Sequence, residues 1–390
     1  MPPGQTIYAG FLAAFVGFAG SFAVVIQGLI GAGATPGQAA SGLLALSLAC
    51  GVCAIILSFT SRLPVAIAWS TPGAALLASG TIAESGFASA VGAFMVCAIA
   101  FIAAGLWRPL GRAVSAIPKH LANAMLAGVL IGLCFAPFKA ITEHPWLGLP
   151  ILSAWIVGGF LHRLAGIPMA LVAFALVVTF GLDTPPSAVS LQGSFFSQPL
   201  EWTTPSFSWS AILSISVPLF LVTMASQNIA GAAVIQSFGY TTKPGPWFAT
   251  TGVFSFLSAP FGGHAVNLAA ITAALCAGDD AHDDPGKRYW ASVFMGVGMI
   301  IFGLASGSVI AFVSLSPPIL LEGVAGLALI GAFTGSAVAA FENPRHRESS
   351  AITFLFAASG VSLLGVAGAF WGLVAGAAMT AVQTRLRRPA

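Results

Sequence analysis

The sequence predicts an all-α integral membrane protein with fourteen membrane-spanning segments in a 7+7 inverted repeat, with the third and tenth spans broken. Three observations predict this fold. The 390 residues are 57% hydrophobic and only 6% charged, whereas soluble domains carry about 25% charged residues. The basic residues gather on one side of the membrane when fourteen spans are counted. Two short, interrupted apolar segments, 64–80 and 263–278, stand at equivalent places in the two halves.

The spans are apolar runs separated by loop signals. A helix needs about 20 residues to cross a bilayer, so the runs fill nearly the whole length and leave no room for a separate soluble domain. The first run lacks the basic n-region of a secretory signal, which favours a retained span. The runs begin near Tyr8, Gln38, Pro64, Phe87, Pro118, Leu149, Gly166, Trp209, Trp247, Gly263, Arg288, Ser316, Ser350 and Gly365.

The distribution of basic residues decides the number of spans and their orientation. If the N-terminus is cytoplasmic and both short segments cross, thirteen of the fourteen Lys and Arg residues are cytoplasmic, and Lys139 is the exception. If either short segment did not cross, the orientation of every later span would be reversed and the charge bias would be lost. The positive-inside rule therefore predicts fourteen spans with both termini in the cytoplasm. The thirteen are Arg62, Arg108, Arg112, Lys119, Arg163, Lys243, Lys287, Arg288, Arg345, Arg347, Arg385, Arg387 and Arg388.

An internal match relates the two halves of the chain. The stretch Ile-Pro-Lys-His-Leu-Ala-Asn, with its proline at 118, matches Ser-Pro-Pro-Ile-Leu-Leu-Glu, with its first proline at 317, at an offset of 199 residues. The two short segments, which start at residues 64 and 263, have the same offset. Because each half contains an odd number of spans, the repeats have opposite orientations. In such transporters, paired short segments mark the substrate site.

Each short segment reads as an extended piece followed by a half-helix that begins at mid-membrane. Thr71 is an N-cap candidate with Pro72 after it, and Asn267 is the equivalent candidate behind Gly262 and Gly263. A helix start exposes unpaired N–H groups and about half a unit of positive charge, so two converging starts predict an anion site. The alternative interpretation is that Thr71 and Asn267 only cap their helices.

Other polar and aromatic residues are candidates for the same site. Gln227 and Asn228 are adjacent amides inside the eighth span, and Gln27 lies in the first. Amides need partners in a medium without water, so they either bind substrate or join helices. Trp69, with Ser70 beside it, stacks on an aromatic substrate or packs in the core.

His264 and Glu322 are the proton-coupling candidates. Apart from cysteines, they are the only titratable residues well inside apolar runs. A buried carboxylate or imidazole is costly when charged and unpaired, so each should change its protonation state readily. The alternatives are a neutral structural histidine and a carboxylate that ties helices together. His264 is preferred because it adjoins the predicted anion site.

The remaining motifs predict no cofactor, no metal and no enzymatic activity. Cys50 and Cys53 form a CxxC on a membrane helix without a nearby His or carboxylate, which favours packing. The acidic loop 279–284 lacks the spacing of an EF-hand and is interpreted as solvated. Nucleophile elbows, zincin motifs and phosphate loops are absent from the sequence. The scattered basic residues also argue against nucleic-acid binding.

Three blocks carry a family resemblance that spans essentially the whole chain. They are LVTMASQNIAG (221–231), APFGGHAVNLAAITAALCAG (259–278) and DDPGKRYWAS (283–292). They resemble the benzoate/proton symporter family, which is related to nucleobase transporters of the uracil permease type. The resemblance implies a core domain (1–107 and 205–308) and a gate domain (108–204 and 309–390). It also implies short antiparallel strands in spans 3 and 10, with substrate between them and span 8.

By this resemblance Thr71, Gln227, His264 and Asn267 lie at the substrate site. Nucleobase permeases have a carboxylate where this chain has Gln227 and Asn228, which disfavours uracil or xanthine. The expected function is import of benzoate or a similar aromatic carboxylate with a proton across the bacterial inner membrane. The alternatives are another small anion or a nucleobase as substrate, a passive anion channel and, least favoured, a membrane enzyme. Related folds often form homodimers, which is a possible assembly here.

Overall fold

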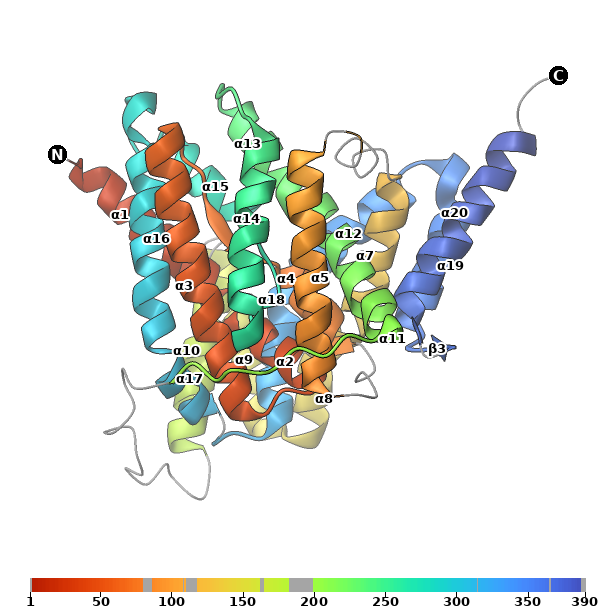
Figure 1. Ribbon diagram of the computed structural model, residues 1–390. Helices are drawn as coiled ribbons and strands as arrows, with labels where there is room; N and C mark the ends of the chain where they lie inside the picture. Colours follow the sequence, from red (N-terminus) through yellow and green to blue (C-terminus); the bar gives the residue numbers. More distant parts are fainter. Residues whose placement is uncertain are drawn as a thin grey trace.

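The computed structural model describes residues 2–79, 86–107, 109, 118–161, 165–181, 199–313, 315–364 and 366–386. Across these residues the protein is mostly helical, with two small two-stranded sheets (Figure 1). Five of the basic residues used to orient the chain lie outside the described residues. They are Arg108, Arg112, Arg163, Arg387 and Arg388. Gly80, which ends the first short segment, and Gly365, near which the last run begins, also lie outside them.

The first half of the chain contains ten described elements. They are α1 (Gly4–Ala19), α2 (Phe22–Gly31), α3 (Pro36–Ser61), β1 (Ile67–Trp69), α4 (Thr71–Ser79), α5 (Phe87–Leu106), α7 (Lys119–Cys134), α8 (Ala136–Glu143), α9 (Pro145–Leu161) and α10 (Gly166–Phe180).

The second half opens with a helix that contains two π-helical segments, η1 and η2. Its elements are α11 (Trp209–Ala211), η1 (Ile212–Ser216), α12 (Val217–Thr223), η2 (Met224–Asn228), α13 (Ile229–Ser237), α14 (Pro244–Ser258), η3 (Ala259–Phe261), β2 (Val266–Leu268), α15 (Ala270–Ala277), η4 (Pro285–Lys287), α16 (Tyr289–Leu304), α17 (Ser306–Val313), α18 (Pro318–Phe341), η5 (Pro344–His346), α19 (Arg347–Ala358), β3 (Ser362–Leu363), β4 (Val366–Ala367) and α20 (Gly368–Leu386).

Local sequence explains where the long helix α3 begins and ends. The Thr35 hydroxyl accepts a hydrogen bond from the Gln38 N–H at 3.2 Å, and the Gln38 side chain accepts one from the Thr35 N–H at 3.0 Å. This capping box, with Pro36 at the first helical position, satisfies donors that a helix start otherwise leaves unpaired. Arg62, in the left-handed conformation at φ 56°, ends the helix. The chain then enters the first broken segment.

Several helical runs are suited to crossing a membrane. Within the described parts of the chain, six are long and apolar enough by length and composition, and three shorter apolar helices accompany them. The six runs are Gly4–Gly31, Pro36–Ser61, Phe87–Leu106, Lys119–Glu143, Trp209–Ser237 and Pro318–Phe341. All fourteen segments expected from the sequence coincide with a helix or a strand–helix pair, and their first residues differ by at most four positions.

The prediction that residues 64–80 and 263–278 are broken is confirmed. Each contains a three-residue strand followed by a short helix, β1 with α4 and β2 with α15. The two strands pair with each other in antiparallel orientation. The strands start at residues 67 and 266 and the helices at 71 and 270, so the offset of 199 residues recurs; it also relates α7 (119) to α18 (318).

The helices pack in two groups. In one, α3 and α1 pack on α16, α5 packs on α14, and α2 packs on α4. In the other, α18 and α19 pack on α7, α20 packs on α19, and α9 joins α8 to α10. The groups meet where α4 contacts α7 and α2 contacts α18. In Figure 1, α3 and α16 stand beside each other and α7, α19 and α20 lie at the other side of the molecule. The start of α1 and the far end of α20 lie toward the same end of the molecule.

Candidate functional site

The two broken segments meet through the β1–β2 pair. Ala68 lies opposite Asn267, and Trp69 lies opposite Val266. The pairing continues beyond the strands, because the Ser70 N–H donates to the Ala265 carbonyl and the Ala269 N–H donates to the Ala66 carbonyl, both at 3.0 Å. Each helix therefore begins next to the strand of the other segment. The starts of α4 and α15 are brought to the same short, buried sheet.

Ser70, rather than Thr71, caps the start of α4. The Ser70 hydroxyl accepts a hydrogen bond from the Gly73 N–H at 3.0 Å and lies 2.7 Å from the Thr223 hydroxyl. Thr71 is the first helical residue and is half-buried. The prediction of Thr71 as the N-cap was wrong because both hydroxyl residues suit a cap, and the strand ends one residue earlier than the sequence suggested. The partner Thr223, in the eighth segment, was not among the predicted site residues.

Asn267 is a strand residue and not the cap of α15. The helix starts at Ala270, after an extended Ala269 that provides no side-chain cap. The prediction was wrong because pairing with β1 keeps the chain extended through Leu268. The buried Asn267 amide donates to the Leu268 carbonyl at 2.7 Å. Its Oδ1 is buried and has no hydrogen-bond partner within the part of the chain that the structure describes.

His264 joins the two broken segments and is fully buried. Its Nε2 lies 2.9 Å from the Ser70 carbonyl oxygen, which can only accept, so Nε2 carries a proton. The other nitrogen, Nδ1, is buried without a partner among the described residues. The Phe94 ring lies edge-on to the imidazole, with 6.3 Å between centroids. The preceding turn uses Gly262 at φ 95°, a conformation that favours glycine.

The adjacent amides of the eighth segment have different surroundings. Asn228 is fully buried, and its Oδ1 accepts a hydrogen bond from the Leu268 N–H at 3.0 Å. Gln227 is half-buried and has no hydrogen-bond partner among the described residues. Both belong to the π-helical segment η2, a distortion that is frequent at functional sites. Asn228 holds the strand that precedes α15, whereas Gln227 has a free amide.

Two further candidates lie on the first segment and in the first strand. Gln27 of α2 is half-buried and has no hydrogen-bond partner in the described part of the protein. Trp69 is only 2% exposed, and its indole N–H donates to the Ser21 hydroxyl at 2.8 Å. The Phe18 ring packs edge-on against it at 5.5 Å. Its surroundings therefore match the packing interpretation, because the ring is enclosed and its donor is satisfied.

Glu322 lies apart from this cluster on α18. It is half-buried, and its charged neighbours are Lys139 and Glu143 of α8. The structure thus brings together Ser70, Thr71, Asn228, His264 and Asn267 through the strand pair and its hydrogen bonds. Glu322 is not part of that set.

A small cleft with a cavity volume of about 40 Å³ opens near the far end of α4. Its lining includes Gly31, Leu77, Val129, Ile215 and Ala369, from both packing groups. None of the candidate binding residues lines it. It adjoins the contact between α4 and α7, which is a seam between the two groups and not the strand pair itself.

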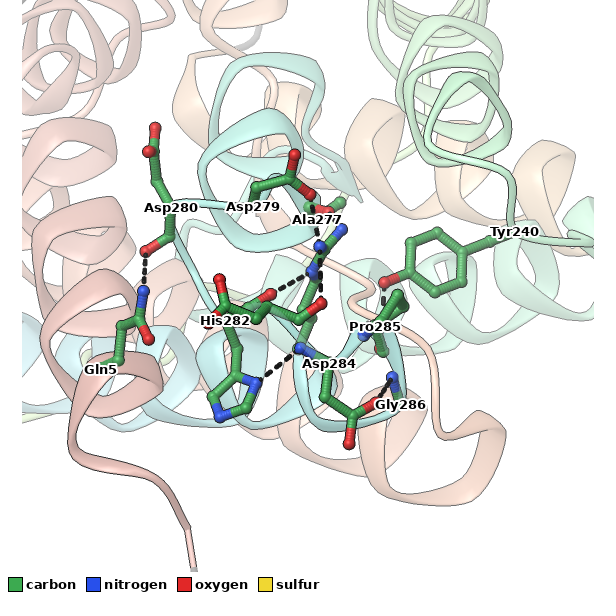
Figure 2. A network of polar contacts seen from close by, with 11 residues as sticks. Gln5, Tyr240, Ala277, Asp279, Asp280, His282, Asp284, Pro285 and Gly286 are labelled. Carbon is green, nitrogen blue, oxygen red and sulfur yellow. Dashed lines mark hydrogen bonds and ion pairs between the residues drawn. The ribbon is translucent and has the colours of Figure 1, made fainter.

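The acidic loop 279–284 is organised by a cation of the protein itself. Arg288 donates to the Asp279 carboxylate and to the backbone carbonyls of His282 and Ala277, at 2.6 and 2.8 Å. Figure 2 shows the loop side chains and carbonyls around this network. Among the described residues, no cluster of three or more His, Cys, Asp or Glu side chains could hold a metal ion. All five cysteines are buried and unpaired.

Comparison with known proteins identifies the family. Residues 2–382 match the family model for the benzoate membrane transport protein, BenE. The chain belongs to the BenE family. It is 36% identical over 379 residues to the inner membrane protein YdcO of Escherichia coli K12, covering 96% of this chain and 94% of YdcO. It is 31% identical over 369 residues to the benzoate membrane transport protein of Acinetobacter baylyi, covering 94% and 92%.

Solved structures that share this fold include those of a bicarbonate transporter and of a solute carrier. The transmembrane domain of the cyanobacterial bicarbonate transporter BicA matches this BenE-family chain with a TM-score of 0.64 at 14% identity, covering 96% of this chain and 97% of that domain. SLC26A9 matches with a TM-score of 0.62 at 14% identity, covering 98% and 66%. These likenesses concern the fold alone. The relation to uracil-permease-type transporters stays an expectation from the sequence resemblance.

Proposed function

We propose that this protein imports benzoate or a similar aromatic carboxylate together with a proton, across the bacterial inner membrane, by alternating access. Membership of the BenE family and the anion-transporter fold support a membrane transporter. The carboxylate would bind between the starts of α4 and α15, which lie at opposite ends of the paired strands, and the aromatic ring would lie against the apolar helices of the second packing group.

The observation that carries the proposal is the uncapped start of α15 beside the strand pair. Its N-cap residue, Ala269, makes no side-chain capping bond, so N–H groups that a helix start leaves unpaired are available to a ligand. A helix start carries about half a positive charge and typically stabilises an anion by about 0.3–1 kcal/mol, or more when buried. The start of α4 lies at the other strand of the same sheet. Gln27, Thr71 and Gln227, all half-buried, would complete the site.

The transport cycle requires two bodies that move relative to each other. We propose fourteen spans in a 7+7 inverted repeat, with residues 1–107 and 205–308 as the core and 108–204 and 309–390 as the gate. The two packing groups support this division, because α1–α5 and α14–α16 lie in one and α7–α10 and α18–α20 in the other. The repeated offset and the antiparallel strands support the inverted repeat. The shared end of the first and last helices supports two termini on the same side of the membrane, which the positive-inside rule assigns to the cytoplasm.

A co-transported proton makes accumulation of an anion possible. Moving a monoanion inward against an inside-negative potential costs about 2.3 kcal/mol per 100 mV, and one proton cancels that charge. His264 is the preferred carrier, because its Nδ1 is a buried acceptor without a partner among the described residues. A protonated imidazole near a bound carboxylate would stabilise it, and the stabilisation is reciprocal. Glu322 is the alternative.

Counterflow in proteoliposomes tests the proposal. Vesicles are loaded with unlabelled benzoate and diluted into labelled benzoate, at a pH where benzoate is almost wholly ionised. A carrier produces a transient accumulation of label inside, whereas a passive channel only equilibrates it. A panel of substituted benzoates and nucleobases as competitors defines the substrate. Label uptake equal to that of protein-free vesicles would refute benzoate transport.

A further inference from the structure

Arg288 is a buried cation that contacts the carbonyl end of α15, whereas the proposed anion site lies at the other end of this helix. Arg288 is only 5% exposed, and a charged group buried in this way requires hydrogen-bond or ion-pair partners. Nη1 donates to the carbonyl of Ala277, the last residue of α15, at 2.8 Å. Nε donates to the His282 carbonyl at 2.6 Å, and Nη2 donates to the Asp279 carboxylate. The guanidinium thus binds the last turn of α15 and the loop that follows it.

The position of Arg288 is unfavourable for its own helix. The residue immediately precedes α16, which begins at Tyr289, and a positive charge at a helix start opposes the helix dipole. At the carbonyl end of α15 the same charge is favourable. The folded chain therefore uses this cation for α15 and its loop rather than for α16.

The segment from the loop to the start of α16, residues 279–289, is attached to three other parts of the protein, and Figure 2 shows the first two of these contacts. Gln5 of α1 donates to the Asp280 carbonyl at 3.3 Å, and Tyr240, from the turn between α13 and α14, donates to the Pro285 carbonyl at 3.0 Å. Arg62, which ends α3, donates to the Tyr289 hydroxyl. The bonds of Arg288 connect α15 to this fixed framework.

We propose that Arg288 is a positioning residue for substrate binding: it holds the carbonyl end of α15, so that the uncapped start of the same helix stays aligned with the carboxylate. The inference rests on the proposed function. An eight-residue helix extends only about 12 Å, so a shift at one end moves the other end with it. Other loop groups bind the same guanidinium, but within the part of the chain that the structure describes, it is the Arg288 side chain that binds the last carbonyl of α15.

The test compares Arg288→Gln and Arg288→Lys with the control Lys287→Gln. Lys287 is half-exposed and, among the described residues, its one ion pair is with Asp284 across 3.6 Å, so its loss leaves the bond from Arg288 to Ala277 intact. Benzoate counterflow gives the apparent KM and the maximal rate for each variant. Hydrogen–deuterium exchange reports on α15, with α4 as the internal reference because its start is capped by Ser70.

The expected result for Arg288→Gln is an apparent KM roughly tenfold higher, the effect of losing a favourable helix-end charge, with the maximal rate retained. The apparent KM of Arg288→Lys should lie between those of Arg288→Gln and the parent, because an ammonium keeps the charge but replaces only some of the hydrogen bonds of the guanidinium. Exchange should rise in α15 but not in α4, and Lys287→Gln should match the parent.

Unchanged KM in the folded Arg288 variants would overturn the inference. So would parallel losses of rate and affinity with faster exchange throughout the protein, since that pattern indicates a structural role only. If Arg288→Gln does not fold, Arg288→Lys decides by the same two readouts. A parent protein without benzoate counterflow would instead refute the proposed function.

Discussion

Gln227 and Asn228 are adjacent amides for which we expect opposite consequences when each is replaced by alanine. The Asn228 side chain accepts the Leu268 N–H at 3.0 Å inside the protein. Gln227 is half-buried and has no partner within the described residues. Asn228→Ala should therefore destabilise the protein, whereas Gln227→Ala should weaken benzoate binding and leave stability nearly unchanged.

The magnitudes follow from the bonds that are lost. Asn228→Ala leaves a buried backbone N–H without an acceptor, which costs about 1–3 kcal/mol of folding stability. Gln227→Ala removes a hydrogen bond to a charged ligand, worth about 1.5–3 kcal/mol. That loss raises the Kd for benzoate roughly 10- to 150-fold.

The assay measures both quantities on purified protein. Benzoate Kd comes from equilibrium binding, and stability comes from unfolding in detergent with and without ligand. Gln236→Ala is the matched control, because Gln236 lies in the same helical run but is exposed, and its side-chain amide donates to the Thr242 hydroxyl. Both of its values should match those of the parent. Unchanged benzoate affinity in a folded Gln227→Ala variant would remove this residue from the site and refute the reasoning.

Two further outcomes are expected. His264→Gln should still exchange benzoate but lose accumulation driven by a pH gradient in vesicles. A His264→Gln variant that still concentrates benzoate as the parent does would exclude His264 as the proton carrier. Glu322 would then be the candidate, tested by Glu322→Gln. Gly28→Ala should displace α4 and lower the unfolding temperature, because a Cβ there would lie 2.4 Å from the Ala74 carbonyl oxygen. Gly132→Ala, whose Cβ meets nothing within 4 Å, should be tolerated; equal unfolding temperatures for the two glycine variants would contradict the close packing of α2 on α4.

The sequence predicted the features that depend on composition and local breaks. The Pro and Gly residues around 64 and 263, with the charge distribution, located both broken segments. The sequence analysis placed the start of α15 too early. The strand pairing that keeps Asn267 extended joins residues about two hundred positions apart, and no local pattern indicates it. It chose Thr71 over Ser70 as the cap for the same reason.

The binding of Arg288 to the acidic loop could also not be predicted from the local sequence. Asp279 and the loop carbonyls bind Arg288, and the sequence alone assigned that arginine to a span end. Thr223 is a similar case, since its partner Ser70 lies in another segment. In both cases the missing information is a contact that forms only when the chain folds and brings separate parts of the sequence together.

The central claim is coupled transport of benzoate, and uptake under an imposed pH gradient tests it most directly. Proteoliposomes with an alkaline interior receive labelled benzoate outside, at a pH where it is almost wholly ionised, and protein-free vesicles give the background from diffusion of benzoic acid. We predict accumulation above that background, abolished by a protonophore and competed by unlabelled benzoate. Uptake that never exceeds the protein-free background, or that a protonophore leaves unchanged, would contradict the account.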